Sequence, residues 1–354
     1  MRPLTSTMPK PVVPLAGQPF IAYMVQWLRR HGVSDVILSC GFMAAGMREV
    51  LGDGSALGVR LRYIEEPEPL GTGGALKFAQ ELLDERFFML NGDVLTDIDL
   101  SAQLAQHERT GARATLALTP VEDPSAYGLV RLGPDGAVSE FVEKPSPEQV
   151  DTDLINAGAY ILQRDVLAGM APAGTNISIE RDVFPELVGR GLYGFAARGY
   201  WLDIGTPERY LQATFDILEG TVTTDGGGPA GGVGAPMLDG APGSGRILAP
   251  SIVQRDCRIA AGAVVGGRAV LGPGVTVGVE ARVESSVLLG RASVGAHSTV
   301  RGCIVGPGAS IGEHCLLQRG VVLGENVHVG DDNVLSAGVR IFPGVQLPAG
   351  AIRF

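Results

Sequence analysis

The stretch VGPGASIGEHCLLQRGVVLGENVHV, residues 305–329, carries an aliphatic side chain at every sixth position. Such a period places one aliphatic side chain on each face of a triangular coil, with about three hexapeptides per turn. Glycines between these positions suit tight corners. The sequence therefore predicts a parallel β-helix. The series, which slips in register through Val294 and Val300, is Val253, Ile259, Val265, Leu271, Val277, Val283, Leu289, Val305, Ile311, Leu317, Leu323, Val329, Leu335, Ile341 and Leu347.

The first half of the chain has a different pattern. Short apolar runs that read as strands alternate with helical spacing at residues 19–32, 75–84 and 207–219, which predicts an open α/β sheet. Ligands of such sheets bind at the carboxyl ends of the strands. The strand candidates are DVILSCG (35–41), VRLRYIEE (59–66), RFFMLNGD (86–93), ATLALTPV (114–121), YGLVRLG (127–133) and AGAYILQ (157–163).

A stretch rich in glycine and proline separates the two patterns. Small residues and proline dominate residues 220–246, a composition typical of a linker. We therefore predict an α/β domain over residues 1–219, a linker over 220–247 and a β-helix over 248–354. A chain of 354 residues is long enough for two domains.

Composition narrows the functional classes. The net charge of −10 argues against a general nucleic-acid or membrane-surface role, since both need a basic face. The four cysteines form no CxxC pair, which favours free thiols in a reducing compartment. No signal segment and no apolar run of membrane-spanning length stands out, so we expect a cytoplasmic protein.

One segment suggests a phosphate-binding site, and another suggests a metal ligand. In EEPEPLGTGGAL (65–76) a strand leads through Gly71, Gly73 and Gly74 into a helix, where backbone N–H groups and the helix N-terminus favour phosphate. Asp93 follows the buried strand FFML, at the expected sheet edge, and could ligate Mg²⁺ or cap the next turn.

Two further segments add charge beyond a strand. FVEKP (141–145) places Glu143 beside Lys144. A glutamate can bind sugar hydroxyls and a lysine can bind phosphate. Taken alone, the two residues also fit an ordinary charge pair on the surface. In YWLDIGTPERY (200–210), Asp203 precedes a helix that we expect to start near Pro207, so it also reads as a helix-flanking acid.

Together, and in this order, these segments resemble the sugar nucleotidyltransferase (NDP-sugar pyrophosphorylase) family, through essentially the whole chain. Within that family they are most similar to the mannose-1-phosphate guanylyltransferases, which also carry a hexapeptide β-helix of the left-handed kind. The stretches that carry the resemblance are PKPVVPLAGQP, PLGTGGAL, NGDVLTD, DPSAYGLV, FVEKP, INAGAYIL, SIERDVFPEL and YWLDIGTP.

The resemblance implies a role for each matching residue. Lys10 would contact the triphosphate or the leaving pyrophosphate, and Lys144 the phosphate of the sugar. Asp93 and Asp203 would hold Mg²⁺. The nucleotide-binding residues would be Gly71, Thr72, Gly73 and Asn91, and the sugar-binding residues Gly128, Glu143 and Asn156.

The implied reaction is attack of a sugar-1-phosphate oxygen on the α-phosphorus of an NTP, with release of pyrophosphate. Positioning and charge neutralisation suffice for it, which explains why lysines and aspartates populate the motifs. GTP and mannose-1-phosphate follow from the resemblance; thymidine or uridine nucleotides with glucose-1-phosphate are the second choice.

Two other classes of function stay open from the residues. A non-catalytic regulatory paralogue would explain an incomplete N-terminal motif, although Lys10, Lys144 and both aspartates are present. A hexapeptide acyltransferase would need a catalytic histidine such as His297, His314 or His328, which also read as surface corner residues. We expect the β-helix to form a homo-oligomer interface instead.

The opening MRPLTSTMPKP resembles the end of the family's phosphate loop, without the strand and glycine cradle that precede it. Met1 stands where the family has leucine, so we expect both features to be encoded upstream of a misassigned start. Without them, neighbouring strands would leave N–H and C=O groups unpaired and the phosphates would lose backbone donors. We expect the 354-residue chain to be poorly soluble or inactive as it stands.

Overall fold

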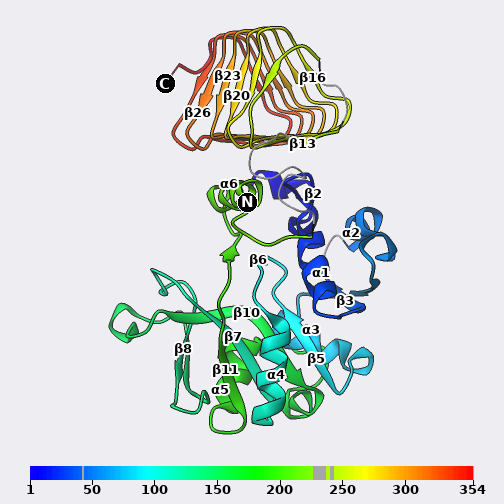
Figure 1. Ribbon diagram of the computed structural model, residues 1–354, viewed down its shortest axis with the longest axis vertical. Coiled ribbons are helices and arrows are strands. Elements are labelled where there is room, and N and C mark those ends of the chain that lie inside the picture. The colour runs from blue at the N-terminus through cyan, green and yellow to red at the C-terminus, as the bar shows by residue number, and fades with distance from the viewer. Residues whose placement is uncertain (42–43, 226–236, 240–242, 354) are drawn as a thin grey trace. The chain divides into compact units, whose positions relative to one another are not determined.

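The computed structural model describes residues 1–41, 44–225, 237–239 and 243–353 (Figure 1). Contacts divide the chain into two compact units. We call residues 25–201 the α/β unit, and residues 1–24 together with 202–354 the solenoid unit. This division differs from the predicted boundaries, because the first 24 residues pack with the C-terminal half of the chain.

The α/β unit contains a mixed six-stranded sheet in the order β11-β7-β10-β8-β9, with β5 also paired to β10. β10 runs antiparallel to β5, β7 and β8, and β11 runs parallel to β7. β3 and β4 form a separate parallel pair. The strands are β3 (Asp35–Cys40), β4 (Arg60–Glu65), β5 (Arg86–Leu90), β6 (Val94–Thr96), β7 (Ala114–Pro120), β8 (Gly128–Leu132), β9 (Val138–Glu143), β10 (Leu154–Gln163) and β11 (Leu192–Ala196).

Helices lie between these strands, as the alternating pattern predicts. Each strand candidate of the sequence is a strand here, so the α/β class is confirmed. α3 begins at Gly71, four residues before the predicted start at 75, and ends at Ala79. The helical segments are α1 (Phe20–Arg30), α2 (Ala44–Leu51), η3 (Ser55–Leu57), α3 (Gly71–Ala79), η4 (Gln80–Leu82), α4 (Leu100–Thr110), η5 (Pro147–Gln149), η6 (Arg164–Gly169), the π-helical turn η7 (Ile179–Val183) and α5 (Phe184–Leu187).

α4 is held to the sheet by buried polar side chains. Asp99 caps its start by accepting from the Ala102 N–H at 3.0 Å. The buried Gln103 amide donates to the carbonyls of Thr115 (3.1 Å) and Ala159 (3.2 Å), on β7 and β10. These bonds satisfy backbone acceptors inside the core, where an unpaired carbonyl would be costly.

His107, one turn further along α4, is 1% exposed, and its Nδ1 lies 2.8 Å from the Thr115 hydroxyl. Burial lowers the pKa of His107 to about 4. Between pH 6.5 and pH 4 the unfolded chain therefore gains a proton that the folded state excludes, and roughly 3 kcal/mol of stability should be lost across this window. We expect His107→Gln to lack that part of the pH dependence of the unfolding free energy, measured with urea from pH 4 to 7.5. An unchanged slope would show that other groups cause the acid sensitivity.

The solenoid unit confirms the predicted parallel β-helix as three sheets of short strands, which Figure 1 shows as stacked coils. The first sheet contains β13 (Met237–Leu238), β15 (Ser251–Val253), β18 (Ala269–Leu271), β21 (Val287–Leu288), β24 (Ile304–Val305), β27 (Val322–Leu323) and β30 (Arg340–Ile341). The second contains β14 (Arg246–Ile247), β17 (Val264–Gly266), β20 (Arg282–Glu284), β23 (Thr299–Arg301), β26 (Leu316–Gln318) and β29 (Val334–Leu335). The third contains β16 (Arg258–Ile259), β19 (Thr276–Val277), β22 (Ser293–Val294), β25 (Ser310–Ile311), β28 (His328–Val329) and β31 (Gln346–Leu347).

The slip in the hexapeptide series is a shortening of the coil by one residue. Strand pairing joins Ile252 to Val270, but Val270 to Val287, one residue sooner. Leu288, and not the predicted Leu289, consequently belongs to the internal aliphatic core. The six-residue period alone does not distinguish Leu288 from Leu289, because the local backbone turn determines which of the two side chains points into the core.

The predicted linker, residues 220–247, is described only in part. Residues 226–236 and 240–242 of that stretch lie outside the described residues. β13 and β14 fall within it and pair with β15 and β17, so the solenoid starts before residue 248.

The N-terminal segment and α6 (Pro207–Glu219) pack with the solenoid in one unit. The segment contains the 3₁₀ turns η1 (Leu4–Ser6) and η2 (Lys10–Val12) and the strands β1 (Pro14–Leu15) and β2 (Gln18–Pro19). The Tyr210 hydroxyl of α6 donates to the Pro14 carbonyl, and the Gln254 amide of the solenoid donates to the Gly17 carbonyl at 2.9 Å. Arg340 of the last coil pairs with Glu208 of α6 at 3.3 Å.

Candidate active site

Gly128 and Glu143 face each other across a strand pair. They are register partners at the ends of β8 and β9. A Cβ added at Gly128 would lie 3.0 Å from Glu143 Oε2 and 2.9 Å from the Phe141 ring. Any larger residue at position 128 would displace the Glu143 carboxylate, so glycine at this position leaves the space that the carboxylate occupies. Burial raises the pKa of Glu143, and the negative charge of Glu180 adds to this rise.

Lys144 directly follows β9 in the left-handed region, at φ 52°. Its backbone N–H donates to the Tyr127 carbonyl at 3.1 Å, and its side chain is exposed. The Tyr127 ring packs edge-on against Trp201, with ring centroids 5.4 Å apart, and the Trp201 indole donates to Ala157 O at 2.8 Å. The Tyr127 and Trp201 rings therefore lie next to the backbone that carries Lys144.

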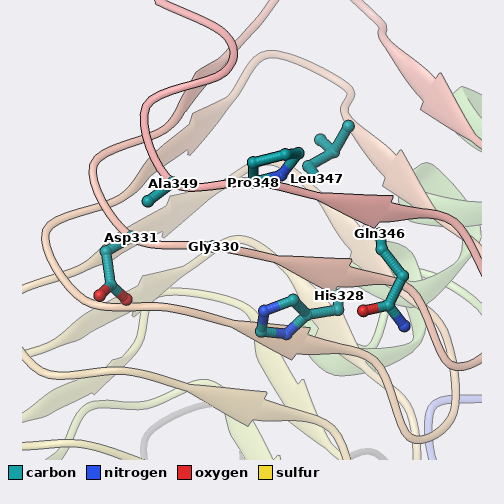
Figure 2. A pocket seen from close by; sticks show the side chains of 7 residues that line it. All are labelled: His328, Gly330, Asp331, Gln346, Leu347, Pro348 and Ala349. Carbon is teal, nitrogen blue, oxygen red and sulfur yellow. The ribbon is translucent and has the colours of Figure 1, made fainter.

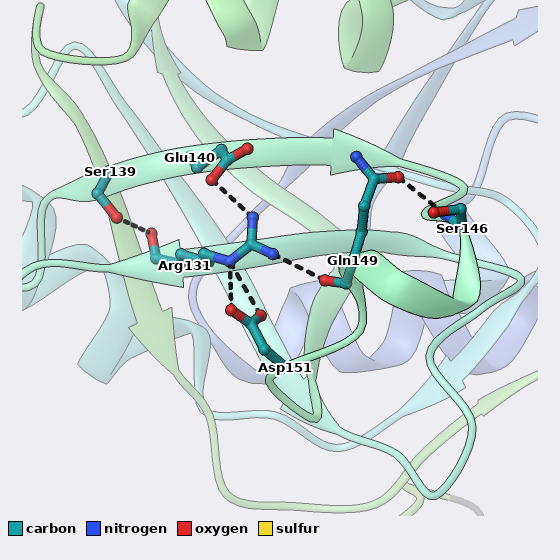
Figure 3. A network of polar contacts seen from close by, with 6 residues as sticks. All are labelled: Arg131, Ser139, Glu140, Ser146, Gln149 and Asp151. Atoms are coloured by element: carbon teal, nitrogen blue, oxygen red, sulfur yellow. Dashed lines mark hydrogen bonds and ion pairs between the residues drawn. The ribbon is translucent and has the colours of Figure 1, made fainter.

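A network around Arg131 fixes the loop after Lys144 (Figure 3). The guanidinium Nε donates to both carboxylate oxygens of Asp151, at 2.9 and 3.0 Å, and Nη1 donates to Glu140 at 2.6 Å. Nη2 donates to the Gln149 carbonyl at 2.7 Å. Ser146 begins this loop with a capping box onto Gln149. The Nε–H group is thus shared between the two oxygens of Asp151, and the charge-assisted bond to Glu140 adds a second carboxylate to the network.

β10 brings Asn156 and Tyr160 together through an irregularity. The register with β7 shifts between these two residues, where Gly158 has φ 73°. Asn156 Nδ2 donates to the Tyr160 hydroxyl at 2.8 Å, and Asn156 Oδ1 accepts from Gly158 N at 3.1 Å. The Asn91 N–H donates to Gly158 O at 2.8 Å, so the predicted residues Asn91 and Asn156 share this corner of the sheet.

The GTGG segment at the start of α3 packs against residues 175–179. The N–H groups of Gly73 and Gly74 donate to Ile177 O, at 2.8 and 3.2 Å. A Cβ at Gly74 would lie 2.5 Å from Thr175 O. The close approach that these two glycines allow is therefore to the protein's own backbone. Nucleotide binding by Gly71, Thr72 and Gly73 stays a prediction.

Asp93 lies in the short turn between β5 and β6 and is half-buried. Asp203 ends β12 (Trp201–Asp203), where Arg209 donates to its Oδ2 at 2.8 Å. Lys10 begins η2. Lys10 and Asp203 belong to the solenoid unit and Asp93 to the α/β unit, so a shared metal site of the two aspartates stays a prediction.

The solenoid histidines lie at its surface. The rings of His297 and His314 stack in successive coils, with centroids 5.0 Å apart, and His297 lies 3.3 Å from Glu280. His328 bonds Ser310 at 2.8 Å and lines a shallow pocket near the last coil (Figure 2). The remaining residues of that pocket are Gly330, Asp331, Gln346, Leu347, Pro348 and Ala349. His297 and His314 have positive φ, which fits the interpretation as corner residues.

Sequence reasoning missed Glu180 and Tyr160. Tyr160 is fully buried and reads as one more apolar residue of the strand AGAYILQ. Glu180 lies in η7, and its carboxylate accepts from the hydroxyls of Thr72 (2.8 Å) and Ser178 (2.9 Å). Its charge helps raise the pKa of Tyr160, after the larger effect of burial. In the sequence, Glu180 was marked only by its position within the motif SIERDVFPEL.

Among the described residues, no group of three or more His, Cys, Asp or Glu side chains is arranged to hold a metal ion. In the same part of the chain, no helix is long and apolar enough to cross a membrane.

Two family models match the chain. The model described as nucleotidyl transferase matches residues 1–220, and the one described as GMPPB C-terminal domain matches residues 247–349. The mannose-1-phosphate guanylyltransferase of Mycobacterium tuberculosis is 35% identical over 358 residues, covering 100% of this chain and 94% of the relative. The catalytic subunit beta of the same enzyme from Danio rerio is 34% identical, with 97% and 92% covered.

Solved structures agree with these matches. The crystal structure of HddC from Yersinia pseudotuberculosis is 29% identical with a TM-score of 0.53, covering 59% of this chain and 90% of that one. HddC complexed with GMP-PN gives the same TM-score at 28% identity, with 61% and 93% covered. With matches that span both its α/β half and its solenoid, the chain belongs to the nucleotidyl transferase family of enzymes, which transfer a nucleotidyl group to a sugar-1-phosphate.

Proposed function

We propose that this enzyme transfers the guanylyl group of GTP to mannose-1-phosphate. The observation that carries the proposal is the identity of 30% or more to mannose-1-phosphate guanylyltransferases over the full chain. An oxygen of the sugar phosphate attacks the α-phosphorus of GTP, the bond to the β-phosphate oxygen breaks, and pyrophosphate leaves.

The polar corner of the α/β unit supports a sugar subsite. Glu143 and Asn156 supply an acceptor and an amide that match ring hydroxyls, and Gly128 keeps the space before Glu143 open. Lys144 would neutralise the sugar phosphate, and Lys10 the triphosphate. Such a site works by orientation and charge stabilisation, without a covalent intermediate.

Mg²⁺ is part of the proposal. Asp93 and Asp203 are half-buried carboxylates, a hard-oxygen donor type that Mg²⁺ prefers, and phosphate oxygens and water would complete the shell. The Arg209 guanidinium donates to Asp203 and so orients this carboxylate. When bound, the metal would supply Lewis-acid stabilisation of the phosphates.

The test is a panel of GTP, ATP, UTP and dTTP against mannose- and glucose-1-phosphate, read by pyrophosphate release. We expect GTP with mannose-1-phosphate to give the highest kcat/KM. Turnover led by dTTP or UTP with glucose-1-phosphate would establish the alternative substrates. The assay is run both on the 354-residue chain and on a chain extended by the expected upstream strand and glycine loop. No turnover of either form with any pair, when the protein is folded by circular dichroism, would favour a regulatory paralogue.

Assembly and location complete the proposal. The solenoid is compatible with a homo-oligomer, and light scattering of the full chain would check it by a mass above 36.9 kDa. We also propose a cytoplasmic location, which suits four cysteines that are all free and buried.

A further inference from the structure

Lys144 has an unusual backbone conformation. Among residues 25–41 and 44–201 of the α/β unit, it is the only residue other than glycine with a positive φ, 52°. It also precedes Pro145, and the residue before a proline is normally extended. A left-handed backbone at such a position costs free energy, so the neighbouring structure must hold it in place.

The strand pair β8–β9 holds the chain on the N-terminal side of Lys144. Glu143, the last residue of β9, is the register partner of Gly128. The Lys144 N–H then donates to the Tyr127 carbonyl at 3.1 Å. These contacts fix the backbone only as far as Lys144, so the conformation of this residue also depends on what holds the chain after it.

On the C-terminal side the chain is held by Arg131, as Figure 3 shows. Its Nη2 donates to the Gln149 carbonyl at 2.7 Å, and its Nε donates to both carboxylate oxygens of Asp151, at 2.9 and 3.0 Å. Gln149 Oε1 in turn accepts from the Ser146 N–H at 2.9 Å, within the capping box that starts two residues after Lys144. A continuous series of bonds therefore leads from Arg131 to the turn that follows Lys144.

The sheet holds Arg131 itself. It lies on β8 opposite Glu140 of β9, whose carboxylate accepts from Nη1 at 2.6 Å. The guanidinium thus contacts two carboxylates, those of Glu140 and Asp151. Because these carboxylates balance its charge, Arg131 offers little direct attraction to a substrate anion. Its contribution to a binding site would come through the loop that it holds.

We propose that Arg131 is a positioning residue for the reaction. It holds the loop of residues 145–151 against β8, and so keeps Lys144 in the left-handed conformation that presents its ammonium group to the phosphate of the sugar-1-phosphate. The inference rests on the proposed function, in which Lys144 neutralises that phosphate. It adds a residue that contacts no substrate and acts through the backbone of another residue.

Arg131→Ala removes the anchor of the loop. The loop should relax, and Lys144 should leave the left-handed region because nothing then offsets the cost of that conformation. We expect the KM for mannose-1-phosphate to rise roughly tenfold, with the KM for GTP within about threefold of the wild type. The kinetics are measured on the form of the chain that turns over, either the 354-residue chain or the extended one.

Gln149→Ala tests the same series of bonds without a change of charge, since it removes the side-chain bond to Ser146 and keeps the carbonyl that Arg131 contacts. Its KM for mannose-1-phosphate should rise in the same direction, roughly fivefold or more. This exposed residue is not part of the core, so the variant should fold even if Arg131→Ala does not.

Arg113→Ala is the matched control. Arg113 lies just before β7 and pairs with the exposed Asp165 at 3.1 Å, an ion pair outside the loop of residues 145–151. Exposed ion pairs of this kind contribute little to stability, so the KM for mannose-1-phosphate should stay within about threefold of the wild type.

A double-mutant cycle separates positioning from a structural role. If Arg131 acts through Lys144, Arg131→Ala should change the KM for mannose-1-phosphate by less than about twofold in the Lys144→Ala background. Amide hydrogen exchange of residues 144–151, measured by mass spectrometry, checks the first step. It should become faster in Arg131→Ala than in the wild type, and stay unchanged in Arg113→Ala.

Three results would overturn the inference and leave the proposed function standing. The first is a wild-type KM for mannose-1-phosphate, or unchanged exchange of the loop, in Arg131→Ala. The second is an equal loss for GTP and mannose-1-phosphate. The third is an additive loss in the double variant, which would make Arg131 a structural residue independent of Lys144. A folded wild type without turnover of any substrate pair in either form overturns the proposed function, and the inference with it.

Discussion

Asp93→Asn and Asp203→Asn should each lower kcat/KM for pyrophosphate release by roughly a hundredfold or more. Asparagine keeps the shape of each side chain but removes the charge with which the carboxylate would hold Mg²⁺ against bridging phosphates. The measurement is a steady-state titration of both substrates at several Mg²⁺ concentrations, with calorimetric titration of Mg²⁺ in the presence of the NTP. Each variant should bind the metal more weakly and turn over its substrates more slowly.

Asp99→Asn is the matched control for this pair. Asp99 is an exposed carboxylate that caps α4, and asparagine caps a helix equally well, so activity should be unchanged. If Asp93→Asn or Asp203→Asn kept near-normal rates with an intact melting curve, the metal assignment would be wrong for that residue.

Lys144→Ala should raise the KM for the sugar-1-phosphate roughly ten- to a hundredfold and leave the KM for the NTP nearly unchanged. A charge-assisted contact to phosphate contributes about 1.5–3 kcal/mol, and about 1.4 kcal/mol corresponds to a factor of ten. The exposed side chain contributes little to packing, so the fold should be unaffected.

Lys144→Arg serves as the comparison, because it keeps the positive charge and the same Cβ at a left-handed backbone position. It should recover most of the sugar-phosphate affinity. Equal weakening of both substrates in Lys144→Ala would instead indicate a general electrostatic effect on the whole active site.

The fold was largely predictable because its signals are periodic. Few folds besides a β-helix place an aliphatic side chain at every sixth residue. α6 lies at residues 207–219 as predicted, since Thr206 caps it, Pro207 opens it and Gly220 ends it. The choice between Leu288 and Leu289 was not predictable, because adjacent aliphatic residues satisfy the same pattern. Only strand pairing across coils distinguishes them.

The site was predictable only in part, since motifs report residues that are adjacent in sequence. Glu143 and Lys144 stand side by side and form a visible pair, whereas Glu180 meets Thr72 across 108 residues and does not. The glycines of GTGG show a second limit of motifs. A glycine-rich pattern indicates that another group approaches the backbone closely. For Gly73 and Gly74 that group belongs to residues 175–177 of the same chain.

The discontinuity of the solenoid unit has a consequence for synthesis on the ribosome. Several partners of the first 24 residues lie in residues made much later, such as Gln254 for Gly17, which is 237 positions downstream. At about 5–20 residues per second, this wait lasts roughly 10 to 50 seconds. Val12, Val13 and Leu15 in this segment are buried in the finished fold. The native contacts of this segment can therefore form only after the C-terminal half of the chain has been made, so we expect the solenoid unit to complete its folding late.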